Sequence, residues 1–174
     1  IPVKQGVYFH DDPCFPDGRG RELTARDFVY ALKRIADVKV KSKSWFIFDG
    51  KVKGLDAFRE YTKTCSRGQV DYDRPVEGLY AEDDFTLVFK LTRPWPQLIY
   101  WLAYIPTSPM AREAVAYYGE DIVSHPVGTG PYILKKWHRG VYLEAVRNPN
   151  YRTCFYPSEG RPGEKVGTDG GRGK

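Results

Sequence analysis

Glycine and proline recur along the chain and limit the length of any helix or strand that it can form. Of the 174 residues, 17 are glycine and 13 are proline. Because proline ends helices and glycine favours turns, the sequence predicts short elements separated by many turns. The chain is 41% hydrophobic and 28% charged, a composition typical of globular domains and unlike that of disordered chains. We therefore expect one domain, or one domain and part of another.

The clearest helix is predicted over residues 24–36. Thr24 is a suitable N-cap, and Asp27 three residues later resembles the second residue of a capping box, with Asp in place of Glu. Apolar residues then recur at helical spacing, Leu32 and Ile35 among them, and give the helix one apolar face. We expect that face to lie in the core.

Further short elements are predicted along the rest of the chain. Alternating apolar residues from Phe85 to Leu91 indicate a strand, and Gly140 occupies the position where a three-residue hairpin loop needs a left-handed residue. Ser108 is a suitable helix cap and Gly119 a suitable helix end. The predicted elements are a strand at 3–10, helices at 55–64, 97–103 and 109–118, and hairpins that join 76–81 to 85–91 and 131–137 to 141–147. This order predicts an α+β fold.

The composition changes near the C-terminal end. Six of the last eighteen residues are glycine, and no apolar periodicity continues there. We interpret residues 157–174 as a flexible tail or loop. The longest apolar run, residues 98–105, has eight residues against the roughly 20 that span a bilayer, so no membrane-spanning helix is predicted.

The net charge of +5 gives little information about partners. The densest basic cluster, Lys39, Lys41 and Lys43, alternates with apolar residues. A nucleic-acid surface typically gathers basic residues on one face together with stacking aromatic residues. We interpret the cluster as a solvated surface and expect no nucleic-acid partner. Binding of an anionic partner by a stand-alone α+β domain remains an alternative.

Catalytic and metal-binding motifs are not evident. Cys14, Cys65 and Cys154 lie far apart, which argues against a structural zinc site and leaves three possible single disulfides open. His10 is followed by two aspartates, which could bind a metal, but we favour the interpretation that a strand ends there in an acidic turn. No serine lies in a G-x-S-x-G motif. We expect no metal, no cofactor and no enzymatic activity, while a small hydrolase with an unrecognised site remains an alternative.

Three stretches in a fixed order resemble the extracellular solute-binding proteins of family 5, the oligopeptide- and dipeptide-binding components of ABC importers. The first comprises residues 6–11 (GVYFHD) and 23–34 (LTARDFVYALKR), and the second residues 84–91 (DFTLVFKL). The third begins with residues 126–132 (PVGTGPY) and ends with residues 147–151 (RNPNY). This third stretch is the most specific, and the ordered set carries the resemblance.

The resemblance implies the accessory lobe of a type II (class C) periplasmic-binding-protein-like fold, together with a β-hairpin that returns to the main lobe. It assigns residues 1–125 to the α+β accessory lobe, residues 126–153 to the returning hairpin, and residues 154–174 to a Gly/Pro-rich tail or insertion. Family members are much longer, and the chain starts at Ile1 without an initiator Met or a signal segment. We therefore expect a fragment of a longer protein.

The resemblance also implies capture of peptides or similar small solutes outside the membrane, and their delivery to the permease subunits of an ABC transporter. It implies a periplasmic or extracellular location, with a lipid anchor as an option for the full-length protein, and no insertion of this chain into the membrane. We expect a cleft-lining strand at 104–107, with Tyr104, Ile105 and Thr107 as ligand-binding candidates, and a hinge or crossover loop formed by Gly128, Thr129 and Gly130. For 104–107, packing as a connection between helices remains an alternative.

Overall fold

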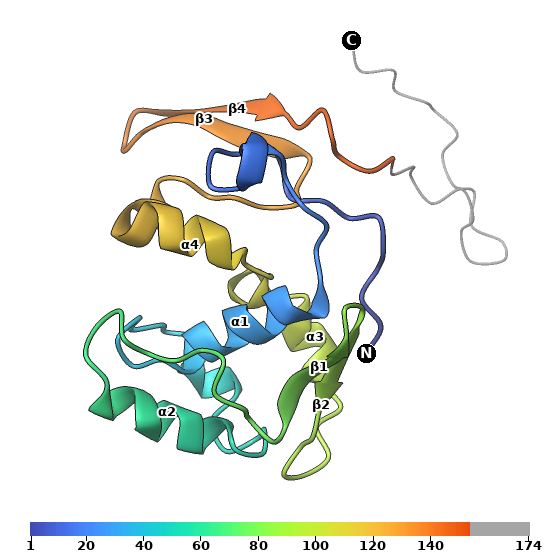
Figure 1. The fold of residues 1–174 in the computed structure, drawn as a ribbon, viewed down its shortest axis with the longest axis vertical. Coiled ribbons are helices and arrows are strands. Elements are labelled where there is room, and N and C mark those ends of the chain that lie inside the picture. The colour runs from blue at the N-terminus through green and yellow to red at the C-terminus, as the bar shows by residue number, and fades with distance from the viewer. Residues whose placement is uncertain (154–174) are drawn as a thin grey trace, which may run out of the picture.

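Helix α1 (Ala25–Ala36) runs through the middle of the molecule, between α4 (Arg112–Tyr118) and α2 (Leu55–Thr64) (Figure 1). The computed structural model describes residues 1–153 and confirms the α+β class. A further α-helix is α3 (Leu98–Leu102). The strands form two antiparallel hairpins, β1 (Leu79–Asp83) with β2 (Thr86–Phe89) and β3 (Tyr132–His138) with β4 (Tyr142–Arg147). Short 3₁₀ helices occur at η1 (Pro16–Gly18), η2 (Trp45–Ile47), η3 (Ile105–Thr107) and η4 (Gly119–Val123).

The start of α1 depends on Asp27. Its carboxylate accepts a hydrogen bond from the Thr24 backbone N–H at 2.8 Å and another from the Thr24 hydroxyl at 3.1 Å. The helix therefore begins where the sequence predicts it, with its first turn stabilised by the side chain of Asp27. Leu32 and Ile35 on the apolar face are both buried, as the helical spacing predicts.

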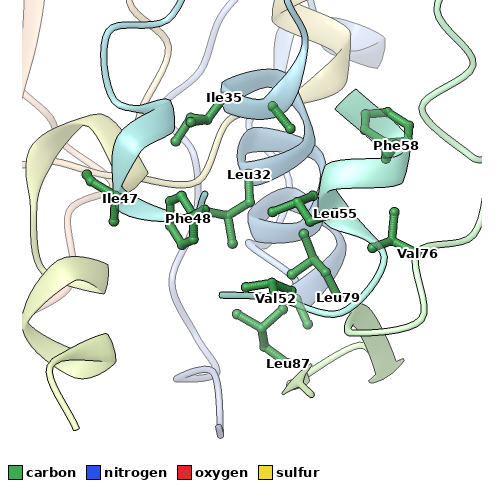
Figure 2. Packing of buried hydrophobic residues seen from close by; sticks show 12 residues of the cluster. Leu32, Ile35, Ile47, Phe48, Val52, Leu55, Phe58, Val76, Leu79 and Leu87 are labelled. Atoms are coloured by element: carbon green, nitrogen blue, oxygen red, sulfur yellow. The ribbon is translucent and has the colours of Figure 1, made fainter. Parts of the chain in front are cut away.

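The main core lies between α1, α2 and the β1–β2 hairpin (Figure 2). Leu32 of α1 packs in one cluster with Leu55 and Phe58 of α2. Leu79 and Leu87 complete the cluster from the two strands of the hairpin. Burial of each such side chain stabilises a fold by about 1.5–3 kcal/mol, so this cluster holds the three elements together.

A second, smaller core lies between the N-terminal segment and α4. It contains Val7 and Phe9 from the segment before α1, and Ala111 and Ala114 from the start of α4. Phe9 is completely buried. Phe28 on α1 packs against both cores, so the central helix joins them.

The strand predicted at residues 3–10 is wrong. The N-terminal segment forms only two isolated bridges. Pro2 pairs with Thr86 of β2, and Tyr8 pairs with Glu22. Gly6 has a φ of +71°, which interrupts the extended backbone between the two bridges. The first residue still extends the sheet of the first hairpin. The amino group of Ile1 donates to the Leu87 carbonyl at 2.8 Å, and the Leu87 N–H donates to the Ile1 carbonyl at 2.9 Å.

Helix α4 starts three residues later than the sequence predicts, and Ser108 does not cap it. The Ser108 N–H instead donates to the Ile105 carbonyl at 3.0 Å, and the Met110 N–H donates to the Asp27 carbonyl at 3.4 Å. The first bond closes the η3 turn and the second holds the segment before α4 against the start of α1, so the helix begins only after this segment. The predicted end is confirmed, because Gly119 is the C-cap with a φ of +55°.

The β3–β4 hairpin lies at the end of the molecule opposite α2 (Figure 1). Gly140 has a φ of +76°, as the predicted hairpin loop requires. Most side chains of this hairpin are exposed, including Tyr132, Val141 and Leu143. The flexible tail expected at 157–174 lies outside the described residues.

Replacing Leu32 with alanine should destabilise the fold by about 2–5 kcal/mol, because the change removes a fully buried side chain from the main core. Arg26→Ala on the same helix is a matched control. Its side chain is 76% exposed and its ion pair with Asp84 is a surface pair, so the expected loss is below about 1 kcal/mol. Denaturant midpoints measure both effects. A neutral Leu32→Ala would show that this face of α1 does not carry the core.

Candidate functional site

Aromatic and aliphatic side chains gather on the surface where α3 meets η2 and η3. Phe46 of η2 and Tyr104, which precedes η3, both pack edge-on against Trp101 of α3, with ring centroids 6.1 and 6.0 Å away. Further exposed residues lie beside Trp101 in α3 and after Tyr104. We name this surface the aromatic patch and define it by five residues, which are 62%, 61%, 79%, 46% and 83% exposed: Phe46, Ile99, Tyr100, Tyr104 and Ile105.

The turn beside the patch is held by Thr107. The hydroxyl of this buried residue lies 2.8 Å from the Trp101 carbonyl oxygen and 2.7 Å from that of Tyr104. The strand expected here is wrong, because Pro106 and these hydrogen bonds favour a 3₁₀ turn between α3 and α4. Of the three residues predicted in this region, Tyr104 and Ile105 reach the surface, whereas Thr107 supports the turn from inside.

The stretch that carries most of the aromatic patch has no charge. No Asp, Glu, Lys or Arg lies between Arg93 and Arg112, and this interval contains both α3 and η3. Lys51 packs near η2, where its ammonium donates to the Ile47 carbonyl at 2.7 Å and lies 4.9 Å from the centroid of the Trp95 ring. Lys51 is therefore already engaged, and so is Arg59, whose guanidinium lies 4.7 Å from the centroid of the Trp45 ring in η2 and donates to the Ala36 carbonyl. Lys43, which precedes η2, is exposed.

The predicted crossover loop packs against the N-terminal segment. The Gly128 carbonyl accepts the His10 backbone N–H at 3.0 Å, and the Gly128 N–H donates to the His10 Nδ1 at 3.4 Å. The Gly130 carbonyl accepts a hydrogen bond from the side-chain amide of Asn148 at 3.0 Å. Thr129 lines a cavity of about 370 Å³. The loop thus joins the β3–β4 hairpin to the rest of the molecule.

The two predicted sets of site residues are not bonded to each other in the part of the chain that the structure describes. Within residues 1–153, no hydrogen bond or ring contact joins 104–107 to 128–130. Thr129 nevertheless lines the same cavity as Leu102 and Ser108, which flank the turn at η3. Thr129 and the residues that flank the η3 turn therefore meet at one cavity, but Tyr104, Ile105 and Thr107 do not line it.

A wider groove of about 1130 Å³ lies between α1, β1 and the start of α4. Nothing in the sequence predicts this groove, because its polar groups come from distant parts of the chain. Arg21 binds Glu113 at 2.6 Å across 92 positions, and Arg112 binds Asp73 at 2.7 Å. These four side chains are already paired, whereas the rings of the aromatic patch face solvent, so we take the patch as the stronger candidate for a binding surface.

The Cys14 thiol is poorly suited to catalysis. Burial and the neighbouring Asp12 raise the pKa of Cys14 to about 12, so this thiol stays protonated at neutral pH. Cys14 and Cys65 are free, and Cys154 lies outside the described residues. Residues 1–153 contain no group of three His, Cys, Asp or Glu side chains that could hold a metal ion. No helix in that part has the length and apolar character needed to cross a membrane.

The chain belongs to a family of solute-binding proteins. The model of the bacterial extracellular solute-binding proteins, family 5 Middle, matches residues 2–170. The chain is 32% identical over 135 residues to the oligopeptide-binding protein AmiA of Streptococcus pneumoniae, and 30% identical over 137 residues to the periplasmic oligopeptide-binding protein OppA of Escherichia coli. These matches cover 75% and 76% of this chain but only 19% and 23% of the two relatives. The resemblance seen in the sequence is confirmed.

Solved structures share the fold of most of the chain. A substrate-binding domain of an oligopeptide ABC transporter from Bacillus anthracis is 26% identical with a TM-score of 0.61, over 76% of this chain and 24% of that one. OppA of Burkholderia pseudomallei is 26% identical with a TM-score of 0.64, over 86% of this chain and 26% of that one. The described α+β fold therefore recurs as about a quarter of larger proteins of this class.

The free energy of unfolding should decrease as the pH falls from 7.5 to 5.5, because of His10. Burial lowers the pKa of His10 below 6.5, although Asp12, the Gly128 backbone and Asp11 oppose this shift. As the pH falls through 6.5, the unfolded chain therefore takes up the proton before the folded chain does, and stability is lost. His10→Gln should remove most of this dependence, because the amide does not titrate. Denaturant midpoints at the two pH values measure it, and an unchanged slope in His10→Gln would contradict the assignment.

Proposed function

We propose that this chain forms part of a protein that captures peptides outside the cytoplasmic membrane and delivers them to an ABC importer. The observation that carries this proposal is the family match over residues 2–170. The names of the two relatives, both oligopeptide-binding proteins, support peptides as the solute. The mechanism is reversible binding with closure of lobes around the solute. Closure requires that the solute binds the closed state more tightly than the open one.

We further propose that residues 1–125 form an accessory lobe and that residues 126–153 form a hairpin that packs into a large lobe. The exposed apolar side chains of the hairpin support this assignment, Tyr132 and Leu143 among them. A two-stranded hairpin is marginally stable in water by itself, so such side chains suit burial against further strands. Residues 128–130 then act as the crossover between the lobes.

We place the solute-contacting surface of this chain at the aromatic patch. Tyr104 and Ile105 were expected to line the cleft, and their exposure supports that role. Aromatic residues commonly line ligand clefts, because each of them provides a large contact area. Thr107 acts there as a support of the turn, since its side chain is buried.

A binding protein of this kind acts in the periplasm or at the cell exterior, beside the permease subunits that receive the solute. The function makes and breaks no covalent bond, in agreement with the high pKa of Cys14. We therefore expect no hydrolysis of ester or peptide substrates by the purified chain. Turnover that disappears on replacement of a single Ser, Cys or His would contradict this expectation.

The 174-residue chain should bind peptides weakly, with dissociation constants above about 1 mM, or roughly −4 kcal/mol. A protein with two lobes buries most of its ligand between two walls, and we assign only one wall to this chain. Calorimetric titration with a mixed pool of di- to oligopeptides measures the affinity. Micromolar binding would show that a complete site lies within these residues and would contradict the lobe assignment.

A further inference from the structure

We infer that the aromatic patch selects solutes with uncharged side chains, and favours aromatic and aliphatic side chains over acidic and basic ones. This inference rests on the proposed function and adds the class of side chain that the chain recognises. It goes beyond peptide binding as such, because a peptide backbone is common to all oligopeptides and its recognition does not discriminate between side chains.

The first reason is the amount of apolar surface that the patch leaves in water. Tyr100 and Ile105 are 79% and 83% exposed, whereas Leu98 in the same helix as Tyr100 is 8% exposed and belongs to the core. A solute side chain that covers the patch removes apolar surface of both partners from water. Covering roughly 60 Å² of apolar surface corresponds to about a tenfold gain in affinity.

The second reason is that Phe46, Trp101 and Tyr104 already contact one another without a solute. Trp101 stands edge-on to Phe46 and Tyr104, with interplanar angles of 90° and 81°. Trp101 also packs against the main core, and Thr107 fixes the turn that carries Tyr104. Rings at right angles offer a face and an edge to a ligand ring, and their fixed positions reduce the entropy lost on binding.

The third reason is the absence of charge from the stretch that supplies four of the five patch residues. A charged solute side chain would lose water at the patch and would gain no ion pair from residues 94–111, which carry no charge. The ammonium of Lys51 is already bonded to the Ile47 carbonyl. The net charge of +5 would by itself attract acidic peptides over the whole surface. A preference for aromatic over acidic side chains would therefore be the reverse of what the net charge favours. Such a preference would show that the solute binds at the patch.

The test is an NMR titration of the isotope-labelled 174-residue chain with capped tripeptides, Ac-Ala-X-Ala-NH₂, in which X is Phe, Leu, Lys or Glu. Lysine is included because aromatic rings also attract cations. Amide shifts of residues 99–105 report binding at the patch. With peptide up to about 20 mM, we expect the Phe and Leu peptides to bind about tenfold more tightly than the Lys and Glu peptides.

Variants with matched controls assign the preference to the patch. Tyr100→Ser and Ile105→Ser should each weaken binding of the Phe peptide by about threefold or more and reduce its advantage over the Glu peptide. Tyr132→Ser and Val141→Ser on the β3–β4 hairpin are the controls, because they remove similar side chains that are 68% and 80% exposed. These controls should leave the titrations unchanged. All four positions are solvent-exposed, and the amide spectrum verifies that each variant is folded.

The possible outcomes separate this inference from the proposed function. Equal shifts at the patch for all four peptides would leave solute contact intact and overturn the selectivity. Tighter binding of the Lys or Glu peptide would overturn it as well, in favour of cation–π attraction or of net charge. Shifts confined to the hairpin, equal losses in the control variants, or no shift at about 20 mM would overturn both the selectivity and the solute contact at this patch.

Discussion

The guanidinium of Arg21 makes the contact on which the arrangement of the helices depends. It binds the two carboxylate oxygens of Asp27 at 2.7 and 2.9 Å and those of Glu113 at 2.6 and 2.8 Å. These bonds join the segment before α1 to the first turns of α1 and α4. The Asp27 side chain is 4% exposed and also caps α1, so loss of Arg21 would leave a buried charge unpaired at the start of the central helix. The same contact lowers the pKa of Glu113.

The positions of the second core and the aromatic patch follow from this contact. With α4 held beside the N-terminal segment, Ala111 and Ala114 pack in the smaller core with Phe9. The chain between α3 and α4 then passes the start of α1, where the Met110 N–H bonds to the carbonyl of the same Asp27. The turn at η3 stays on the surface along this path, and the aromatic patch forms there.

The sequence predicted the elements whose signals are local. Helices α1 and α2 and the left-handed Gly140 follow from spacing, caps and turn chemistry within a few positions. The N-terminal segment has the apolar pattern of a strand, but its partners are distant and Gly6 interrupts it. The patch could not be recognised from hydrophobicity, because the adjacent Leu98 and Ile99 are 8% and 61% exposed. Only the packing of α3 on the core decides which of the two faces water. The order of the predicted elements gave only the α+β class, whereas the family resemblance supplied the solute-binding family and directed attention to the region around Tyr104.

Contact between a peptide and the aromatic patch is tested most directly by photochemical crosslinking. A capped peptide with a benzophenone side chain in place of phenylalanine is irradiated with the 174-residue chain, and mass spectrometry identifies the labelled residues. We predict label on Phe46 and residues 99–105, displaced by an excess of the phenylalanine peptide. Label confined to the β3–β4 hairpin, or label that the competitor does not displace, would contradict a solute-contacting role for this surface.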